Sequence, residues 1–550
     1  MRFLTFGFFI LALGWLVPNH YDPWVSFYNE FAAGAGLCIG AMPLLRAGHI
    51  RMPAAIVVPA AALLAALVID ASLSRLLFQT DFYAGVLFAT LWLLAGAVGA
   101  NPSHFSMPLG WRGPSAQVKN DAVLTALGLA LTLGALTSVA LASIQWLGLP
   151  HGLWVSGSSG RALSNLVQPN HYATLLVMAI AGLGCLRAQR QVGTSVFWLA
   201  VAVLAFGVLS SDSRTGLVAL VLVLLMWLWR AAWVEHNRAQ VLQFGLALLL
   251  LLVARACFQD LAAWLGAEPG RAATDLQSQS RLLIWRQLLA ATQAQPWTGY
   301  GWLQVSAGQD AMAPVYPGGR MVGFAHNLPL DVALWFGIPA ALVFTLSCAA
   351  WLVRHASLRD EARFHPLLML SPVALHSLLE FPHAYAYFLI PAGILVGHVA
   401  RFDAPAMRQA RPWAVALLLA ICSILGVALL WVQTQAEEPM RAALSGDAAM
   451  ADFAPLDRRV PIGDDVAALV RTLADAKAAD AASVERARRV ALRYPWRAVK
   501  RQYVLALFLH DQDPEACREL EIFRHAYSEN AHMQLQQSIR LARTRPLRCR

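Results

Sequence analysis

The stretch AVLTALGLALTLGALTSVALASIQW, residues 122–146, decides the fold class because its twenty-five residues include no charged side chain. A transmembrane α-helix needs about 20 consecutive apolar residues, within a range of roughly 17–25. This stretch is therefore long and apolar enough to cross a bilayer as one helix.

Similar apolar runs lie on both sides of this stretch and predict an all-α polytopic membrane protein of about 12–13 transmembrane helices. The thirteen candidate spans are 3–17, 24–45, 53–69, 82–100, 122–146, 172–186, 195–209, 216–234, 241–257, 328–353, 365–380, 384–400 and 412–433. The first run resembles a signal peptide. It lacks a small-residue cleavage site before Pro18 and further spans follow, so we predict a retained helix.

The composition agrees with a membrane protein and excludes a purely soluble protein, a disordered chain and a disulfide scaffold. Hydrophobic residues make up 58% and charged residues 13% of the chain, against about 45–50% and about 25% in soluble domains. Of the 74 charged residues, 35 lie in residues 437–550. We therefore predict a transmembrane domain, 1–433, followed by a water-soluble helical domain, 434–550.

The positive charges predict the orientation of the spans. With the N-terminus in the cytoplasm, 15 Lys and Arg fall in inner loops and 3 in short outer loops, which is a strong positive-inside bias. An odd number of spans then places the soluble domain and a long segment, about 258–325, outside. The net charge is +10, but the cations of the transmembrane domain are scattered singly between apolar runs and form no basic stripe, so we exclude nucleic acid as a partner.

Three outer arginines are candidate ligands for an anionic group at the membrane surface. Arg161 lies in GSSGRALSNLVQPNHYA, Arg214 in SSDSRTGLV and Arg281 in SQSRLLIWRQLL, which also holds Arg286. A guanidinium group matches phosphate oxygens with two parallel hydrogen bonds, so converging arginines would suit a diphosphate head group. The alternative is an interfacial arginine, or one that pairs with Asp212 or Glu380.

The outer face also carries candidate acid–base groups. His326, in GFAHNLPLDVALWFGIPA, lies where the long outer segment re-enters the membrane, and histidine can act as a general base near neutral pH. The alternative is an interfacial histidine at a helix start. His171 lies at the equivalent edge of the sixth span, and Glu380 and Tyr385 lie in LHSLLEFPHAYAYFLIP. We find no HExxH, Walker A or Asp-rich pair, which argues against nucleotide-driven transport and nucleotide-sugar chemistry.

The ordered segments RALSNLVQPNHYA, SDSRTG, SRLLIWRQLL with PWTGYGW, and AHNLPLDVALWFGIP resemble the O-antigen ligase/Wzy superfamily of bacterial inner membranes. QPNH together with LHSLLEFPHAYAYFLIP resembles its PglL-type branch, the O-linked protein oligosaccharyltransferases. The resemblance covers roughly residues 150–400. It implies a GT-C-type fold without metal or cofactor. It also implies transfer, on the periplasmic face, of an oligosaccharide from undecaprenyl diphosphate to Ser or Thr hydroxyls of exported proteins such as pilin.

The resemblance also implies roles for particular residues. The essential histidine of the family falls on His326, and the arginines that meet the diphosphate fall on Arg161, Arg214 and Arg281. The glutamine of QPNH is Gln168, and the tyrosine after the E-[FY]-P turn is Tyr385. Weaker candidates for contact with donor or acceptor are Asn170, His171, Asn327 and Glu380. Two departures, LWFG near Trp335 and the pair His383-Ala384, concern acceptor handling.

Apolar residues spaced by three and four predict amphipathic helices in the soluble domain, either as TPR-like pairs or as a generic helical bundle. Its cysteines, Cys517 and Cys549, can pair if the domain faces an oxidising compartment. Alternative functions remain at this stage. They are an O-antigen ligase that uses lipid A core as acceptor, a Wzy-like polymerase, and a transporter of lipid-linked glycan.

Overall fold

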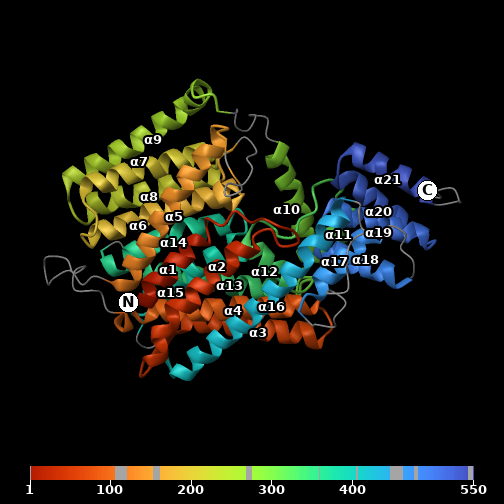
Figure 1. The fold of residues 1–550 in the computed structure, drawn as a ribbon, viewed down its shortest axis with the longest axis horizontal. Helices are drawn as coiled ribbons and strands as arrows, with labels where there is room; N and C mark the ends of the chain where they lie inside the picture. The colour runs from red at the N-terminus through yellow and green to blue at the C-terminus, as the bar shows by residue number, and fades with distance from the viewer. Residues whose placement is uncertain are drawn as a thin grey trace.

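The computed structural model describes residues 2–105, 121–150, 152, 161–267, 276–357, 359–403, 407–445, 462–475, 481–542 and 549. Within these ranges the chain is almost entirely α-helical (Figure 1). Two short strands, β1 (Ile50–Pro53) and β2 (Met407–Ala410), pair antiparallel, with Ile50 opposite Ala410. The prediction of an all-α protein is confirmed.

Every predicted span overlaps a helix. The helices are α1 (Arg2–Leu13), α2 (Phe27–Ala41), α3 (Ala54–Ser72), α4 (Gln79–Ala100), α5 (Ala122–Trp146), α6 (Pro169–Ala188), α7 (Thr194–Ser210), α8 (Arg214–Trp233), α9 (Arg238–Trp264), α12 (Leu328–Phe336), α13 (Ile338–His355), α14 (Glu361–Ser377), α15 (Ala386–Ala400) and α16 (Pro412–Ser445). Within the described part of the chain, eight are long and apolar enough to cross a membrane, and α1, α7 and α15 are shorter apolar helices. The polytopic prediction is confirmed.

The prediction of one continuous span over 328–353 is wrong, because the chain breaks at Gly337 between α12 and α13. Gly337 has a φ of 89°, and a Cβ there would lie 2.4 Å from the carbonyl oxygen of Trp297. The Pro-containing segment after it, Ile338-Pro339, starts a new helix. A glycine is needed at this position both for the left-handed backbone and for the close approach of a second chain segment.

The long segment 258–325 carries more helix than its sequence suggested. Helix α9 continues to Trp264, and the segment also contains α10 (Leu276–Ala294) and α11 (Val305–Met312). The side chain of Gln287 on α10 donates hydrogen bonds to the carbonyl oxygens of Tyr316 and Gly318, and accepts one from Gln309 on α11. The segment is thus folded on itself rather than an irregular connection.

The membrane helices pack around α6, nearly all of which is buried. Helix α15 lies so close against α4 that a Cβ on Gly99 would collide with the backbone of Ile394. The indole N–H of Trp15 donates to the carbonyl oxygen of Tyr387 at 3.1 Å, which ties the end of α1 to α15. These contacts fix the N-terminal ends of α6 and α15, where the candidate site lies.

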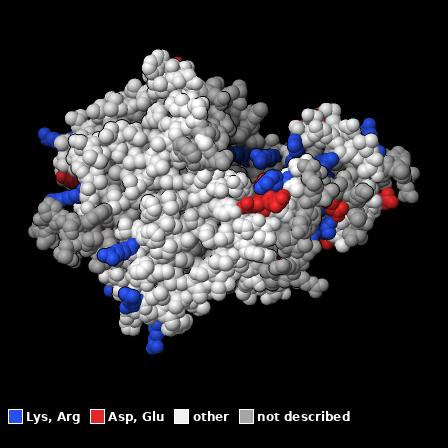
Figure 2. All heavy atoms as spheres, viewed as in Figure 1, with Lys and Arg blue, Asp and Glu red and all other residues white. Residues whose placement is uncertain are grey.

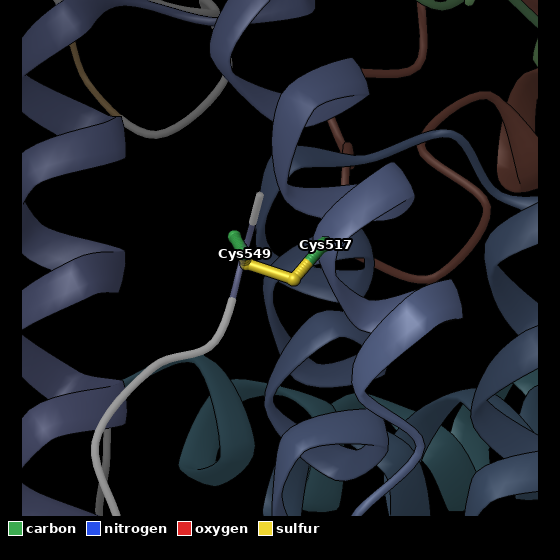
Figure 3. The surroundings of a disulfide bond; sticks show 2 residues. All are labelled: Cys517 and Cys549. Atoms are coloured by element: carbon green, nitrogen blue, oxygen red, sulfur yellow. A yellow bond between two sulfur atoms is a disulfide. The ribbon is translucent and has the colours of Figure 1, made fainter.

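Five further helices follow α16 and share a separate hydrophobic core. They are α17 (Asp464–Ala474), α18 (Ala481–Arg493), α19 (Arg497–Leu509), α20 (Asp513–Ala526) and α21 (Glu529–Ala542). We call them the C-terminal helices. The last turns of α16 supply Val432, Ala436 and Met440 to this core. A disulfide joins Cys517 on α20 to Cys549 (Figure 3).

The C-terminal helices contact the segments that were predicted to lie outside the membrane. Asp464 accepts hydrogen bonds from the backbone of Gln79 and Thr80, and Arg493 pairs with Asp81 at 2.7 Å. Charged side chains gather at this end of the molecule, next to a largely uncharged body (Figure 2). Strands β1 and β2, in contrast, join two segments predicted to be cytoplasmic.

Candidate active site

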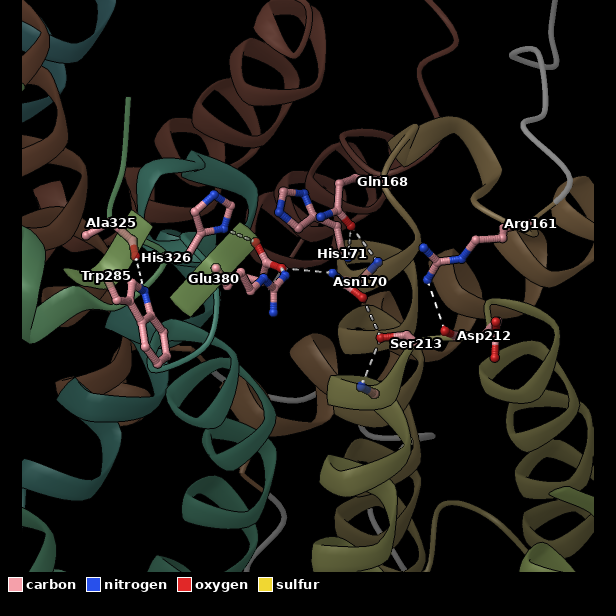
Figure 4. A network of polar contacts seen from close by, with 12 residues as sticks. Arg161, Gln168, Asn170, His171, Asp212, Ser213, Trp285, Ala325, His326 and Glu380 are labelled. Carbon is pink, nitrogen blue, oxygen red and sulfur yellow. Dashed lines mark hydrogen bonds and ion pairs between the residues drawn. The ribbon is translucent and has the colours of Figure 1, made fainter. Parts of the chain in front are cut away.

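Glu380 is the centre of the polar network at the N-terminal ends of α6, α8 and α12 and the C-terminal end of α14 (Figure 4). It follows α14, where its backbone N–H donates to the carbonyl oxygen of His376 at 2.8 Å. Only 4% of its side chain is exposed. One carboxylate oxygen accepts from Arg281 and from Asn170, the latter at 3.2 Å, and the other meets Nδ1 of His326. Because burial of a carboxylate is costly unless it is paired, these partners account for its position.

His326 stands on the short segment just before α12, with a φ of 56°. The following residue, Asn327, caps α12 by accepting the N–H of Leu330 at 3.1 Å, and its amide donates to the carbonyl oxygen of Leu378. The edge of the His326 ring packs on Phe381, with 4.9 Å between ring centroids. The ring is therefore held from α12 and from the turn after α14 together.

A chain of hydrogen bonds links Glu380 to the start of α8. The Asn170 amide donates to Glu380, and its oxygen accepts from the hydroxyl of Ser213 at 2.7 Å. Ser213 caps α8 by accepting the N–H of Gly216 at 3.0 Å. Gln168 caps α6 in the same way, because its side-chain oxygen accepts the N–H groups of Asn170 and His171. The QPNH motif thus builds a helix start that presents Asn170 to Glu380.

His171 lies beneath this network and is buried. Its Nδ1 shares a hydrogen bond of 2.9 Å with the hydroxyl of Tyr387, and its ring lies edge-on to Tyr385 at 4.5 Å. Tyr385 is partly buried, and its ring stacks near Phe381. Both residues therefore support the floor of the site, whereas His326, with 23% of its side chain exposed, is open to it.

The three predicted arginines lie in different surroundings. Arg281, 39% exposed, reaches Glu380 from α10. Arg161 donates to the backbone carbonyl oxygens of Ser211 and Asp212 at 2.9 and 3.1 Å, just before α8 (Figure 4). Arg214 is the first residue of α8 and is exposed. Arg281 thus makes the ion pair that was one of the two alternatives, and its role in diphosphate binding stays a prediction.

Sequence reasoning missed three residues of the network: Ser213, Trp285 and Asp331. Ser213 could have been found as a helix cap in SDSRTG, since Ser before an apolar run is a common start signal. Trp285 and Asp331 bind the backbone of Ala325, next to His326, at 2.8 and 2.6 Å. No motif predicts these contacts: Trp285 is 40 positions from Ala325, and Asp331, though only six positions away, has no sequence pattern that marks it as an acceptor for this N–H.

A cavity of about 1770 Å³ opens beside the site. Its walls come mainly from apolar side chains of α2, α3, α4, α12, α13, α14 and α16. Phe324, Leu378 and His383 line it close to His326. Its size and apolar walls suit a long hydrocarbon chain.

The arrangement can carry out proton transfer next to a bound anion. With Nδ1 of His326 donating to Glu380, Nε2 keeps its lone pair and can accept a proton. The Glu380 carboxylate then stabilises the imidazolium that forms. Arg281 has further N–H donors beyond those that meet Glu380. Within the described residues, no group of three or more His, Cys, Asp and Glu side chains is placed to hold a metal ion.

Two protein-family models match separate parts of the chain. The O-antigen ligase family matches residues 199–345, which include Arg214, Arg281 and His326. The family described as virulence factor membrane-bound polymerase, C-terminal, matches residues 366–541, which include Glu380 and most of the C-terminal helices. The two matches thus cover His326, Arg281 and Glu380, whereas Asn170 and His171 lie before the first of them.

Two curated relatives come from Acinetobacter baylyi. The chain is 27% identical to a general O-oligosaccharyltransferase over 438 residues, which is 77% of this chain and 74% of the relative. It is 28% identical to a ComP-specific O-oligosaccharyltransferase over 250 residues, 45% of each chain. With the membrane fold and the two family matches, these similarities support a PglL-type O-oligosaccharyltransferase of the O-antigen ligase superfamily, which is a glycosyltransferase.

Proposed function

We propose that this protein transfers an oligosaccharide from undecaprenyl diphosphate to Ser or Thr hydroxyls of exported proteins such as pilin, without a metal or other cofactor. The observation that carries the proposal is the contact of His326 and Arg281 with one buried carboxylate, Glu380. It puts a general base and a cation for the leaving group on either side of a single anchor. The relatives, which are named O-oligosaccharyltransferases, support the choice of a protein acceptor.

In the proposed reaction the acceptor hydroxyl oxygen attacks the anomeric carbon of the first sugar. The bond between that carbon and the diphosphate oxygen breaks, and the hydroxyl proton passes to Nε2 of His326. Glu380 holds the other ring nitrogen, which fixes the tautomer and stabilises the imidazolium. Arg281, with Arg161 and Arg214, neutralises the charge that develops on the leaving diphosphate.

The large apolar cavity supports a polyprenyl donor. Its walls run from the centre of the membrane helices to Phe324 and Leu378, next to the site. A polyprenyl chain in this cavity would bring its diphosphate to the outer membrane surface, where the arginines lie. The lipid would contribute binding energy, and the protein would need only to orient the two reacting atoms.

We also propose that residues 434–550 form a periplasmic helical domain and that the protein lies in a bacterial inner membrane with its site facing the periplasm. The ratio of 15 inner to 3 outer Lys and Arg supports this orientation. The disulfide Cys517–Cys549 supports it independently, since disulfides persist in oxidising compartments. A periplasm-dependent reporter joined after Ala542 should be active, and a reporter active only in the cytoplasm would refute the orientation.

A transfer assay tests the proposed function directly. The purified protein in lipid nanodiscs would receive a defined undecaprenyl-diphosphate oligosaccharide and, in separate reactions, a pilin-like protein or lipid A core. We expect glycosylation of the protein only, with no loss after addition of a chelator. His326→Ala should fold, bind the donor and lose transfer by about 10²–10⁴-fold. Transfer to lipid A core alone would identify an O-antigen ligase instead.

A further inference from the structure

The peptide group of Ala325, which directly precedes His326, is held by side chains at both of its polar ends. Its N–H donates to Oδ1 of Asp331 at 2.6 Å. Its carbonyl oxygen accepts from the indole N–H of Trp285 at 2.8 Å (Figure 4). Asp331 lies on α12 and Trp285 on α10. Helices α10 and α12 therefore both hold the same peptide group.

The backbone at His326 needs such support, because its φ of 56° lies in the left-handed region. A residue with a Cβ occupies that region at a cost, and it stays there only where the surroundings enforce it. Ala325 is fully buried, so its polar groups would lose their hydrogen bonds without Asp331 and Trp285. The two side chains thus stabilise the backbone turn that points the His326 ring at Glu380.

Asp331 is itself placed with little freedom. It is fully buried in the first turn of α12, and its second carboxylate oxygen has no hydrogen-bond partner among the described residues. That oxygen lies 3.6 Å from Nε2 of His383, the side chain that lines the apolar cavity. Burial of a carboxylate with one oxygen unsatisfied is unfavourable, and a plain helix start does not require it.

We infer that Asp331 and Trp285 are positioning residues for the base: they hold the Ala325 peptide so that His326 adopts the left-handed backbone that brings Nδ1 to Glu380 and leaves Nε2 facing the acceptor. The inference rests on the proposed function. Neither side chain contacts the reacting atoms, and both act through His326. Their loss should therefore lower the rate of the chemical step and leave donor binding unchanged.

The decisive variants are Asp331→Leu, Asp331→Asn and Trp285→Phe, assayed for transfer by the purified protein in nanodiscs. Asp331→Leu removes the acceptor for Ala325 N–H and should lower kcat about hundredfold, the usual cost of misplacing a catalytic group by about 1 Å. KM for the lipid-linked donor should not change. Asp331→Asn keeps an acceptor oxygen and should restore most of kcat. Trp285→Phe removes only the N–H donor and should lower kcat about tenfold.

Two control variants test whether the effect depends on the contact with Ala325 or only on the type of substitution. Asp260→Leu on exposed α9 and Trp297→Phe on an exposed tryptophan make the same chemical changes away from Ala325 and should transfer normally. An Asp331→Asn variant as slow as Asp331→Leu would overturn the inference. A rise in donor KM with kcat unchanged would do the same, because it would mean that Asp331 serves binding.

A second measurement covers the case in which Asp331→Leu disturbs the structure beyond the Ala325 peptide. In a His326→Ala background the base is already absent, so adding Asp331→Leu should not lower the residual transfer rate further. Any additional loss would show that Asp331 acts on something other than His326 and would overturn the inference. If the native protein transfers glycan and His326→Ala does not, while Asp331→Leu transfers at full rate, only this inference fails. A native protein that transfers nothing would refute the proposed function and this inference with it.

Discussion

Glu380 accepts hydrogen bonds from three side chains at once, so a change at Glu380 affects each of the three differently. The carboxylate must be ionised to accept from His326, Arg281 and Asn170 together. An amide in its place would offer one acceptor and one donor, and the donor would face either Arg281 or the Nδ1–H of His326. The His326 ring would then lose its fixed tautomer.

Glu380→Gln should therefore lower kcat by about 10²–10⁴-fold, as removal of base assistance does. The variant should still accumulate in the membrane, since the side chain keeps its volume. Single-turnover transfer with saturating donor is the measurement. Glu438→Gln, an exposed glutamate on α16, is the matched control. A fast Glu380→Gln enzyme would mean that His326 does not depend on this carboxylate.

Arg281→Lys should cost both binding and rate, because lysine keeps the charge but loses the two-pronged contact. A charge-assisted hydrogen bond is worth roughly 1.5–3 kcal/mol, so kcat/KM for the donor should fall about tenfold to a hundredfold. Arg161→Lys and Arg214→Lys should raise KM for the donor without loosening His326, because Arg281 is the arginine that pairs with Glu380. Donor titrations of all three variants distinguish a loss of both kcat and affinity from a rise in KM alone. Equal effects from all three variants would contradict the distinct role of Arg281.

At the scale of elements, hydropathy is sufficient to predict the membrane helices but not the breaks within them. A run of apolar residues has one low-energy form in a bilayer, so its position follows from composition. The break at Gly337 depends instead on the approach of the Trp297 backbone, which no local pattern records. The polar network likewise depends on contacts between distant parts of the chain, which no local pattern records. His326 and Glu380 are 54 positions apart, and Arg281 and Glu380 are 99.

Gly337→Ala should destabilise the α12–α13 junction by about 1–3 kcal/mol, because alanine disfavours the left-handed backbone and its Cβ would meet backbone atoms that cannot move away. The thermal midpoint of the purified protein in detergent is the readout. Gly245→Ala, in the middle of α9 with open space around it, should be neutral or stabilising by about 0.5–1 kcal/mol. A Gly337→Ala protein as stable as the native one would contradict the observed junction.

At the scale of the whole molecule, a buried ion cluster joins the C-terminal helices to α11. Lys500 on α19 pairs with Asp310 on α11 and with Glu519 on α20, and Arg518 lies 3.5 Å from Asp310. The first three side chains are all buried. Removal of one partner from such a cluster leaves an uncompensated charge and costs about 3–5 kcal/mol.

Lys500→Met should therefore loosen the contact between α11 and the C-terminal helices without unfolding the membrane helices. Hydrogen exchange of the α11 and α20 amides should become faster, while that of α6 should not change. Arg524→Met, which removes an exposed cation from α20, provides the comparison. Unchanged exchange in α11 would show that the cluster does not hold the two parts together.

The same cluster predicts how the contact responds to pH. Burial lowers the pKa of Lys500, but Asp310 and Glu519 outweigh it, so the pKa lies above its ordinary value. Its contribution is then present below the unfolded value and lost only in strong alkali. Burial raises the pKa of Glu519, so the folded protein binds a proton at this carboxyl more readily than the unfolded chain does, and the contribution of this group to stability becomes more favourable as the pH falls. Exchange protection of α11, corrected for intrinsic rates, should therefore persist from about pH 8 to about pH 5.5; its loss on acidification would contradict this reading.

The length of helix α16 affects where the C-terminal helices lie relative to the membrane helices. Its 34 residues make a rod about 50 Å long, whereas the hydrocarbon core of a bilayer is about 30 Å thick. The far end of the rod is built into the core of the C-terminal helices through Ala436 and Met440. In the proposed orientation, the length and tilt of α16 would therefore set the height of those helices above the lipid. A stiff spacer of this kind would set how far an acceptor can project from the membrane and still present its hydroxyl to the site, so the reach of the enzyme would be a property of one helix length.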